Sequence, residues 1–165
     1  SFILAAIGIP LLVYGFYVFD MGEPAKWGGR FVLLSILAYL INLGVSISKS
    51  KNESIHAIYV FTSVVWLFLT AFLGLVLVYN FTTDLLHYDS LHYLPLHVHA
   101  GIVGWFLLLV IGVSSRLIPM FLISKYHNVK LLKWIFLLIN MALVSYILIF
   151  YGFQFLMQKS TRVKM

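Results

Sequence analysis

Two histidines separated by one residue, His97 and His99, are the side chains of this sequence best suited to metal chemistry. They begin an apolar run that reads His-Val-His-Ala-Gly-Ile-Val-Gly-Trp over 97–105. On an α-helix each residue turns by about 100°, so positions i and i+2 point about 200° apart. The pair therefore predicts a helix that presents one imidazole to each of two metal or heme partners. A single shared zinc ion would favour i and i+4 spacing instead.

A second group of histidines precedes this pair. The chain contains no cysteine, so histidine is the strong donor that it offers to transition metals. His87 and His92 are five residues apart, which turns by about 140° on a helix, so only a folded loop brings them together. Such a loop, with Asp84 and Asp89 nearby, would suit copper or zinc. The alternative is an aromatic loop at the depth of lipid headgroups.

The residues that follow the pair sort onto two faces of the predicted helix. At about 100° per residue, the face of His97 is lined by small residues and one leucine: Gly101, Gly104, Leu108 and Gly112. The face of His99 is bulky and apolar: Val103, Phe106, Val110 and Val113. Glycines at this spacing suit either a flat porphyrin or a close neighbouring helix. We assign Gly101 and Gly104, with both histidines, to a candidate cofactor site and keep helix packing as the alternative.

The composition indicates which elements position these residues. Of the 165 residues, 62% are hydrophobic and 10% are charged, and the mean hydropathy is +1.02. A helix that crosses a hydrocarbon core needs about 20 apolar residues. The sequence offers five runs of this kind, at 2–19, 31–48, 57–79, 95–119 and 134–157. We expect an all-α, polytopic integral membrane bundle, a single domain over 1–165 with the lipid bilayer as a partner.

The net charge of +6 has to be interpreted in this setting. Basic residues stand at the ends of apolar runs, where they meet lipid headgroups, so nucleic acid is excluded as a partner. The loops after the first and third runs carry only Lys26 and Arg30, and most lysines follow the second and fourth runs. The positive-inside rule then predicts a cytoplasmic N-terminus. In a bacterial inner membrane, the same rule places residues 87–99 on the periplasmic side.

The two ends of the sequence predict that the chain is a fragment of a larger bundle. It opens at Ser1, already inside an apolar run and without a methionine. The basic tail with Lys159, Arg162 and Lys164 falls outside under the orientation above, against the positive-inside rule. We expect either the opposite orientation or a chain that continues beyond residue 165. Other membrane subunits or further helices would then complete the assembly.

The run from His97 to Trp105, followed by Pro119, resembles the helix of heme–copper oxidase main subunits that carries two heme ligands. The similarity covers Leu94–Pro119 and is closest to the nitric oxide reductase and high-affinity cytochrome c oxidase branches. NnrS-like heme–copper membrane proteins are equally similar over this segment. The resemblance implies that His97 binds a high-spin heme and His99 a low-spin heme. It also implies a copper ion, for which this chain shows no ligand set.

The function implied by this resemblance is electron transfer through heme to dioxygen or nitric oxide, as in a respiratory chain. If the protein turns over substrate, it is an oxidoreductase of the terminal oxidase or nitric oxide reductase type, with catalytic residues that the sequence does not assign. One alternative is a gas-handling or sensor heme protein without turnover. Another is a non-catalytic membrane subunit whose histidines make hydrogen bonds only. Bound heme separates this last alternative from the others.

Overall fold

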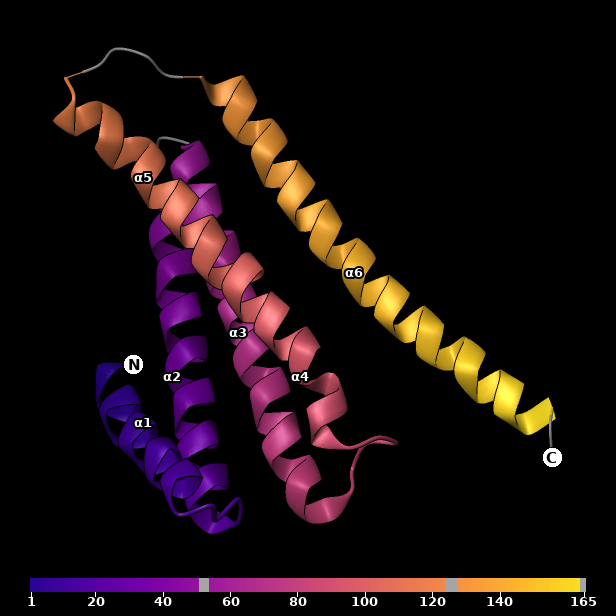
Figure 1. Ribbon diagram of the computed structural model, residues 1–165. Helices are drawn as coiled ribbons and strands as arrows, with labels where there is room; N and C mark the ends of the chain where they lie inside the picture. Colours follow the sequence, from indigo (N-terminus) through magenta and orange to yellow (C-terminus); the bar gives the residue numbers. More distant parts are fainter. Residues whose placement is uncertain (51–53, 124–127, 164–165) are drawn as a thin grey trace. The chain divides into compact units, whose positions relative to one another are not determined.

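The computed structural model describes residues 1–50, 54–123 and 128–163, with side chains up to residue 152. Within these residues all regular secondary structure is helical, which confirms the predicted all-α class (Figure 1). The elements are α1 (Phe2–Tyr17), α2 (Glu23–Ser48), α3 (Ile55–Thr83), α4 (Ser90–His99), η1 (Ala100–Leu107), α5 (Leu108–Phe121) and α6 (Val129–Val163). The elements α4, η1 and α5 follow one another without a break and form one long helix.

Four helices within the described residues are long and apolar enough to cross a membrane: Glu23–Ser48, Ile55–Thr83, Ser90–Phe121 and Val129–Gly152. The chain is therefore a helical membrane protein. The run predicted at 2–19 forms α1, an apolar helix of 16 residues that is shorter than these four. It ends before Phe19, whose φ of 59° lies in the left-handed region that a continuing helix does not use.

The long helices extend beyond the apolar runs that mark them in the sequence. The helix α2 begins at Glu23 rather than at residue 31, because Pro24 occupies its first turn, where a missing N–H costs no hydrogen bond. The helix α3 likewise reaches Thr83. Lys26 and Arg30, which the sequence places in a loop, therefore lie within the first eight residues of α2.

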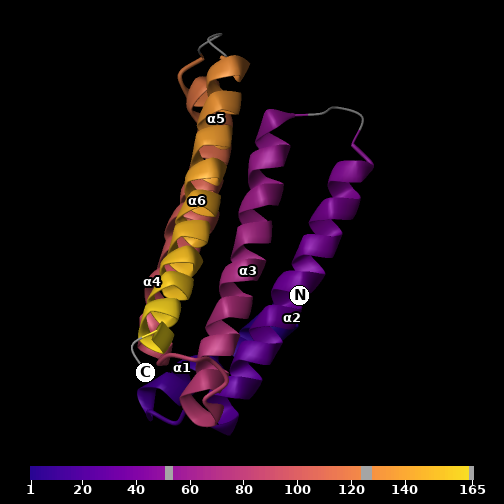
Figure 2. The same cartoon turned by 90° about the vertical axis from the view of Figure 1, so that its right-hand side faces the viewer.

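The chain divides into two compact units, residues 1–127 and 128–165. In the first unit α1 packs on α2, α2 packs on α3, and α3 packs on the long helix of α4, η1 and α5. Figures 1 and 2 both show α2 and α3 side by side. The second unit consists of α6, and the Asn128 side chain accepts a hydrogen bond from the Leu131 N–H near its first turn.

Small residues let the helices of the first unit approach closely. A Cβ atom added at Gly15 of α1 would lie 2.8 Å from the backbone nitrogen of Ala25 in α2. Ala25 itself is fully buried. In a membrane, where apolar side chains gain little from leaving lipid, such close contact is a main source of helix association.

The connection from α3 to α4 is fixed by a buried asparagine. Asn80, at 4% exposure, donates hydrogen bonds to the Tyr88 carbonyl at 3.1 Å and the Ser90 hydroxyl at 3.0 Å. Its carbonyl oxygen accepts from the Leu86 N–H. The Ser90 hydroxyl in turn donates to the Leu77 carbonyl of α3. These bonds hold the first turn of α4 against the end of α3 and so set the direction of the helix that carries the histidine pair.

Candidate functional site

The two central histidines lie where the long helix changes its hydrogen-bond pattern. His97 and His99 end α4, and Ala100–Leu107 continues as a π-helix before α5 begins. π-Helices are rare in proteins, and those that occur frequently lie at functional sites. Pro95, one turn before His99, lies inside α4 and has no N–H to donate. The sequence gives no direct signal for the π-helix, because glycine and apolar residues of this kind also form ordinary α-helices.

The imidazole of His97 lies against α3. A Cβ atom at Gly74 would be 2.9 Å from His97 Cε1 and 3.4 Å from its Nδ1, so only glycine leaves room for the ring. The Nδ1 atom is buried and has no hydrogen-bond partner among the described residues. His97 is thus a polar side chain set into the interface with α3, where the backbone of Thr70 is its hydrogen-bonding neighbour.

The glycine face that His97 shares is filled by the same helix. A Cβ atom would lie 3.2 Å from Thr70 Cγ2 if added at Gly101, and 2.7 Å from Trp66 Cγ if added at Gly104. Leu108, further along this face, is fully buried. Of the two occupants that the sequence allows, a porphyrin or a neighbouring helix, the structure has the helix α3. A porphyrin plane does not fit between His97 and Gly74 in this arrangement.

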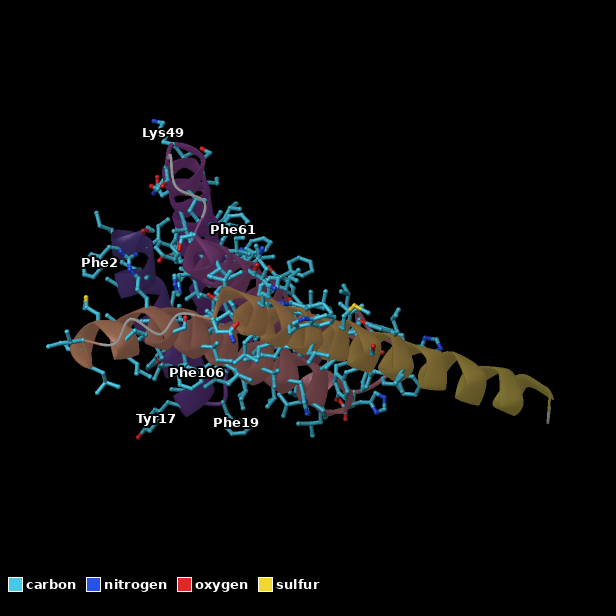
Figure 3. The ribbon with its side chains drawn as sticks, turned by 90° about the horizontal axis from the view of Figure 1, so that it is seen from above. Phe2, Tyr17, Phe19, Lys49, Phe61 and Phe106 are labelled. Atoms are coloured by element: carbon cyan, nitrogen blue, oxygen red, sulfur yellow. The ribbon has the colours of Figure 1, made fainter. Side chains whose placement is uncertain are left out.

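His99 lies on the other side of the helix and is exposed. Its Nδ1 is 2.7 Å from the carbonyl oxygen of Pro95. Since a carbonyl can only accept, Nδ1 carries the proton, and in a neutral imidazole Nε2 then carries the lone pair. Further along the helix, Phe106 (labelled in Figure 3), Val110 and Val113 are 55%, 41% and 40% exposed. The predicted bulky apolar face therefore exists, and α3 does not cover it.

The two histidines of the second candidate group, His87 and His92, belong to an aromatic cluster at the start of α4. The rings of Tyr88 and His92 have centroids 4.9 Å apart, and those of His92 and Tyr93 are 5.5 Å apart and nearly perpendicular. His87 meets Tyr88 edge-on at 6.1 Å. In the part of the chain that the structure describes, no group of three or more histidine, cysteine, aspartate or glutamate side chains is placed to hold a metal ion. The geometry favours the interfacial aromatic loop.

A polar cluster between α2 and α3 was not predicted from the sequence. Arg30 donates from Nε to the Tyr79 hydroxyl at 2.7 Å, and its Nη2 donates to the same oxygen. The guanidinium carbon lies 4.6 Å from the centroid of the Trp27 ring. Lys26 Nζ lies 5.2 Å from the centroid of the Tyr79 ring. Lys26 and Arg30 are four residues apart, a spacing that places them on one helix face. This signal was missed because the apolar run that predicts α2 begins only at residue 31.

Comparisons with family models, curated proteins and solved structures found no match to this chain. His99 has an oriented ring on an exposed apolar face, and His97, Gly101 and Gly104 lie in the interface with α3. His87 and His92 lie in the aromatic cluster.

Proposed function

We propose that this chain is a heme-binding membrane protein that carries electrons, in which His99 would hold the heme through Nε2. The observation that carries the proposal is the hydrogen bond from His99 Nδ1 to the Pro95 carbonyl. Histidines that bind metals almost always donate their other ring N–H in this way, which fixes the ring and its tautomer. The exposed apolar residues that follow His99 along the helix offer the kind of surface that lines cofactor sites.

Each part of this site has a separate task. The Pro95 carbonyl would make the imidazole a more basic ligand, and the exposed Phe106, about 10 Å further along the helix axis, would offer an apolar contact to the porphyrin. When bound, heme supplies a carrier of one electron. The resemblance to heme–copper oxidase main subunits adds dioxygen or nitric oxide as the electron acceptor. That reaction would require further helices or subunits, because α3 occupies the face of His97 in this structure.

A second candidate function is that of a non-catalytic membrane subunit. The observation that favours it is the close packing of His97 on Gly74, together with Gly104 on Trp66. In this role His97 fills a notch in α3 and His99 closes a turn of its own helix through Pro95. Such a subunit would bind no heme.

A reduced-minus-oxidised absorption spectrum of the full chain, expressed with ample heme and purified in detergent, separates the two functions. The heme proposal predicts heme bands in the wild type, their loss or shift in His99→Ala, and unchanged bands in His92→Ala. His92 is the matched control, since it is an exposed histidine on the same helix. A wild type without heme bands would support the structural subunit.

We also propose the bacterial inner membrane as the location, with the N-terminus in the cytoplasm and the start of α4 in the periplasm. The absence of cysteine from the chain makes the test direct. Asp89 and Lys49 are exposed at opposite ends of the first unit. An impermeant maleimide added to intact cells should label Asp89→Cys and should label Lys49→Cys only after permeabilisation. The reverse labelling pattern would contradict the orientation.

A further inference from the structure

The cluster of Lys26, Arg30 and Tyr79 presents hydrogen-bond donors without an anionic partner. The Tyr79 hydroxyl accepts two bonds from Arg30, so its own O–H remains a donor. Three further N–H groups of the guanidinium and the whole Lys26 ammonium remain as well. Within the described residues neither cation makes an ion pair with a carboxylate; their contacts are to Tyr79 and Trp27. The nearest acidic residue along α2, Glu23, accepts from the Trp27 indole at 2.7 Å.

The two cations face the same side of α2 because they are four residues apart. A like-charge pair at this spacing destabilises a helix unless an anion lies between the charges. Arg30 is also held in one orientation, since Trp27 contacts its guanidinium and Tyr79 binds two of its nitrogens. A half-buried guanidinium held in one orientation, with three N–H groups left to donate, is the arrangement that suits phosphate oxygens.

The position of the cluster indicates the source of the phosphate. Lys26 and Arg30 lie within the first eight residues of α2, and Tyr79 lies in the last turns of α3, so the cluster stands at one end of two membrane-length helices. Trp27, which is 46% exposed, and Tyr79 are residue types that favour the headgroup level of a bilayer. The apolar part of α2 begins directly after Arg30, where acyl chains would run.

We propose that Lys26, Arg30 and Tyr79 form a binding site for the phosphate group of a phospholipid. The probe is phosphatidylglycerol in dodecylmaltoside micelles, with diacylglycerol of the same acyl chains as the lipid without phosphate. Binding is measured with fluorescent phosphatidylglycerol titrated into the purified full chain. We expect wild type to bind phosphatidylglycerol and not diacylglycerol, and Arg30→Gln to weaken binding by about tenfold.

Two further variants keep the test decisive. Tyr79→Phe retains the ring but removes the hydroxyl that orients Arg30, and it should weaken binding by several fold with an unchanged helical circular dichroism spectrum. Lys49→Gln removes an exposed lysine just after the other end of α2 and should bind as the wild type does. Equal binding by wild type and Arg30→Gln would overturn the proposal. Displacement by inorganic phosphate at equal concentration would overturn the lipid as the source.

Discussion

Replacing Gly112 by alanine should weaken the packing of α5 on α3. A Cβ atom at this position would lie 2.6 Å from the Cβ of Tyr59, whereas carbon atoms in contact rest about 3.5–4.0 Å apart. The clashing atom is the first carbon of the Tyr59 side chain, so a change of rotamer cannot move it. Tyr59 is also fully buried. The two helices must therefore separate by about 1 Å to accept one methyl group.

The size of the effect follows from two opposing contributions. Overpacking of this kind costs about 1–3 kcal/mol, and alanine gains about 1 kcal/mol over glycine inside a helix. The variant Gly44→Ala provides the reference, because its new Cβ would lie 3.5 Å from Phe61 Cε2, which is ordinary contact. The helix gain cancels between the two variants. We expect Gly112→Ala to have a free energy of unfolding about 1–3 kcal/mol below that of Gly44→Ala.

The assay is reversible unfolding of the purified chain in detergent micelles, followed by circular dichroism in the far ultraviolet. Both variants should retain the helical spectrum of the wild type before denaturant is added. Equal free energies of unfolding for Gly112→Ala and Gly44→Ala would refute the close approach of α5 to α3. The same result would remove the argument that α3 fills the glycine face.

Three other predictions concern the surroundings of the histidine pair. Asn80→Ala removes three hydrogen bonds of the α3–α4 connection. The free energy of unfolding should therefore fall by about 1–3 kcal/mol, and proteolysis at residues 84–89 should accelerate. An unchanged cleavage rate would contradict the role of Asn80 in holding this connection. His97→Leu removes a buried nitrogen without a partner and should raise the free energy of unfolding by about 1 kcal/mol; a decrease would show instead that the packing of the ring against Gly74 outweighs the cost of that nitrogen. Gly74→Ala should lower the free energy of unfolding in the wild type, because the new Cβ meets the His97 ring, but not in the His97→Ala background. A double-mutant cycle measures this difference.

Much of the fold could be predicted because its main determinant is hydropathy. Apolar runs of membrane length identified α2, α3, α6 and the long helix that begins with α4. Helix ends were less accessible, because the first turns of α2 contain charged and aromatic residues suited to an interface rather than to hydrocarbon. For this reason the hydropathy pattern places Lys26 and Arg30 in a loop. The contact of Arg30 with Tyr79 joins residues 49 positions apart, which no local pattern reveals.

The sequence defined the faces of the histidine helix but not what covers them. Positions 97, 101, 104, 108 and 112 do lie on one face, and that face packs on α3. The occupant could not be predicted, because small residues suit a porphyrin and a neighbouring helix equally. The π-helix over Ala100–Leu107 was missed since its changed hydrogen-bond pattern has no residue signature. The bond between His99 and Pro95 depends on a ring rotamer, which spacing alone does not specify.

Titration of hemin into the detergent-purified full chain, followed at the Soret band, tests the central claim most directly. Heme binding through His99 predicts saturation at one heme per chain for the wild type and for His92→Ala. His99→Ala should fail to saturate, and added imidazole should restore its Soret band by replacing the missing ligand. Saturation of His99→Ala with wild-type affinity, or a wild type that binds no heme, would contradict the assignment of His99 as the axial ligand.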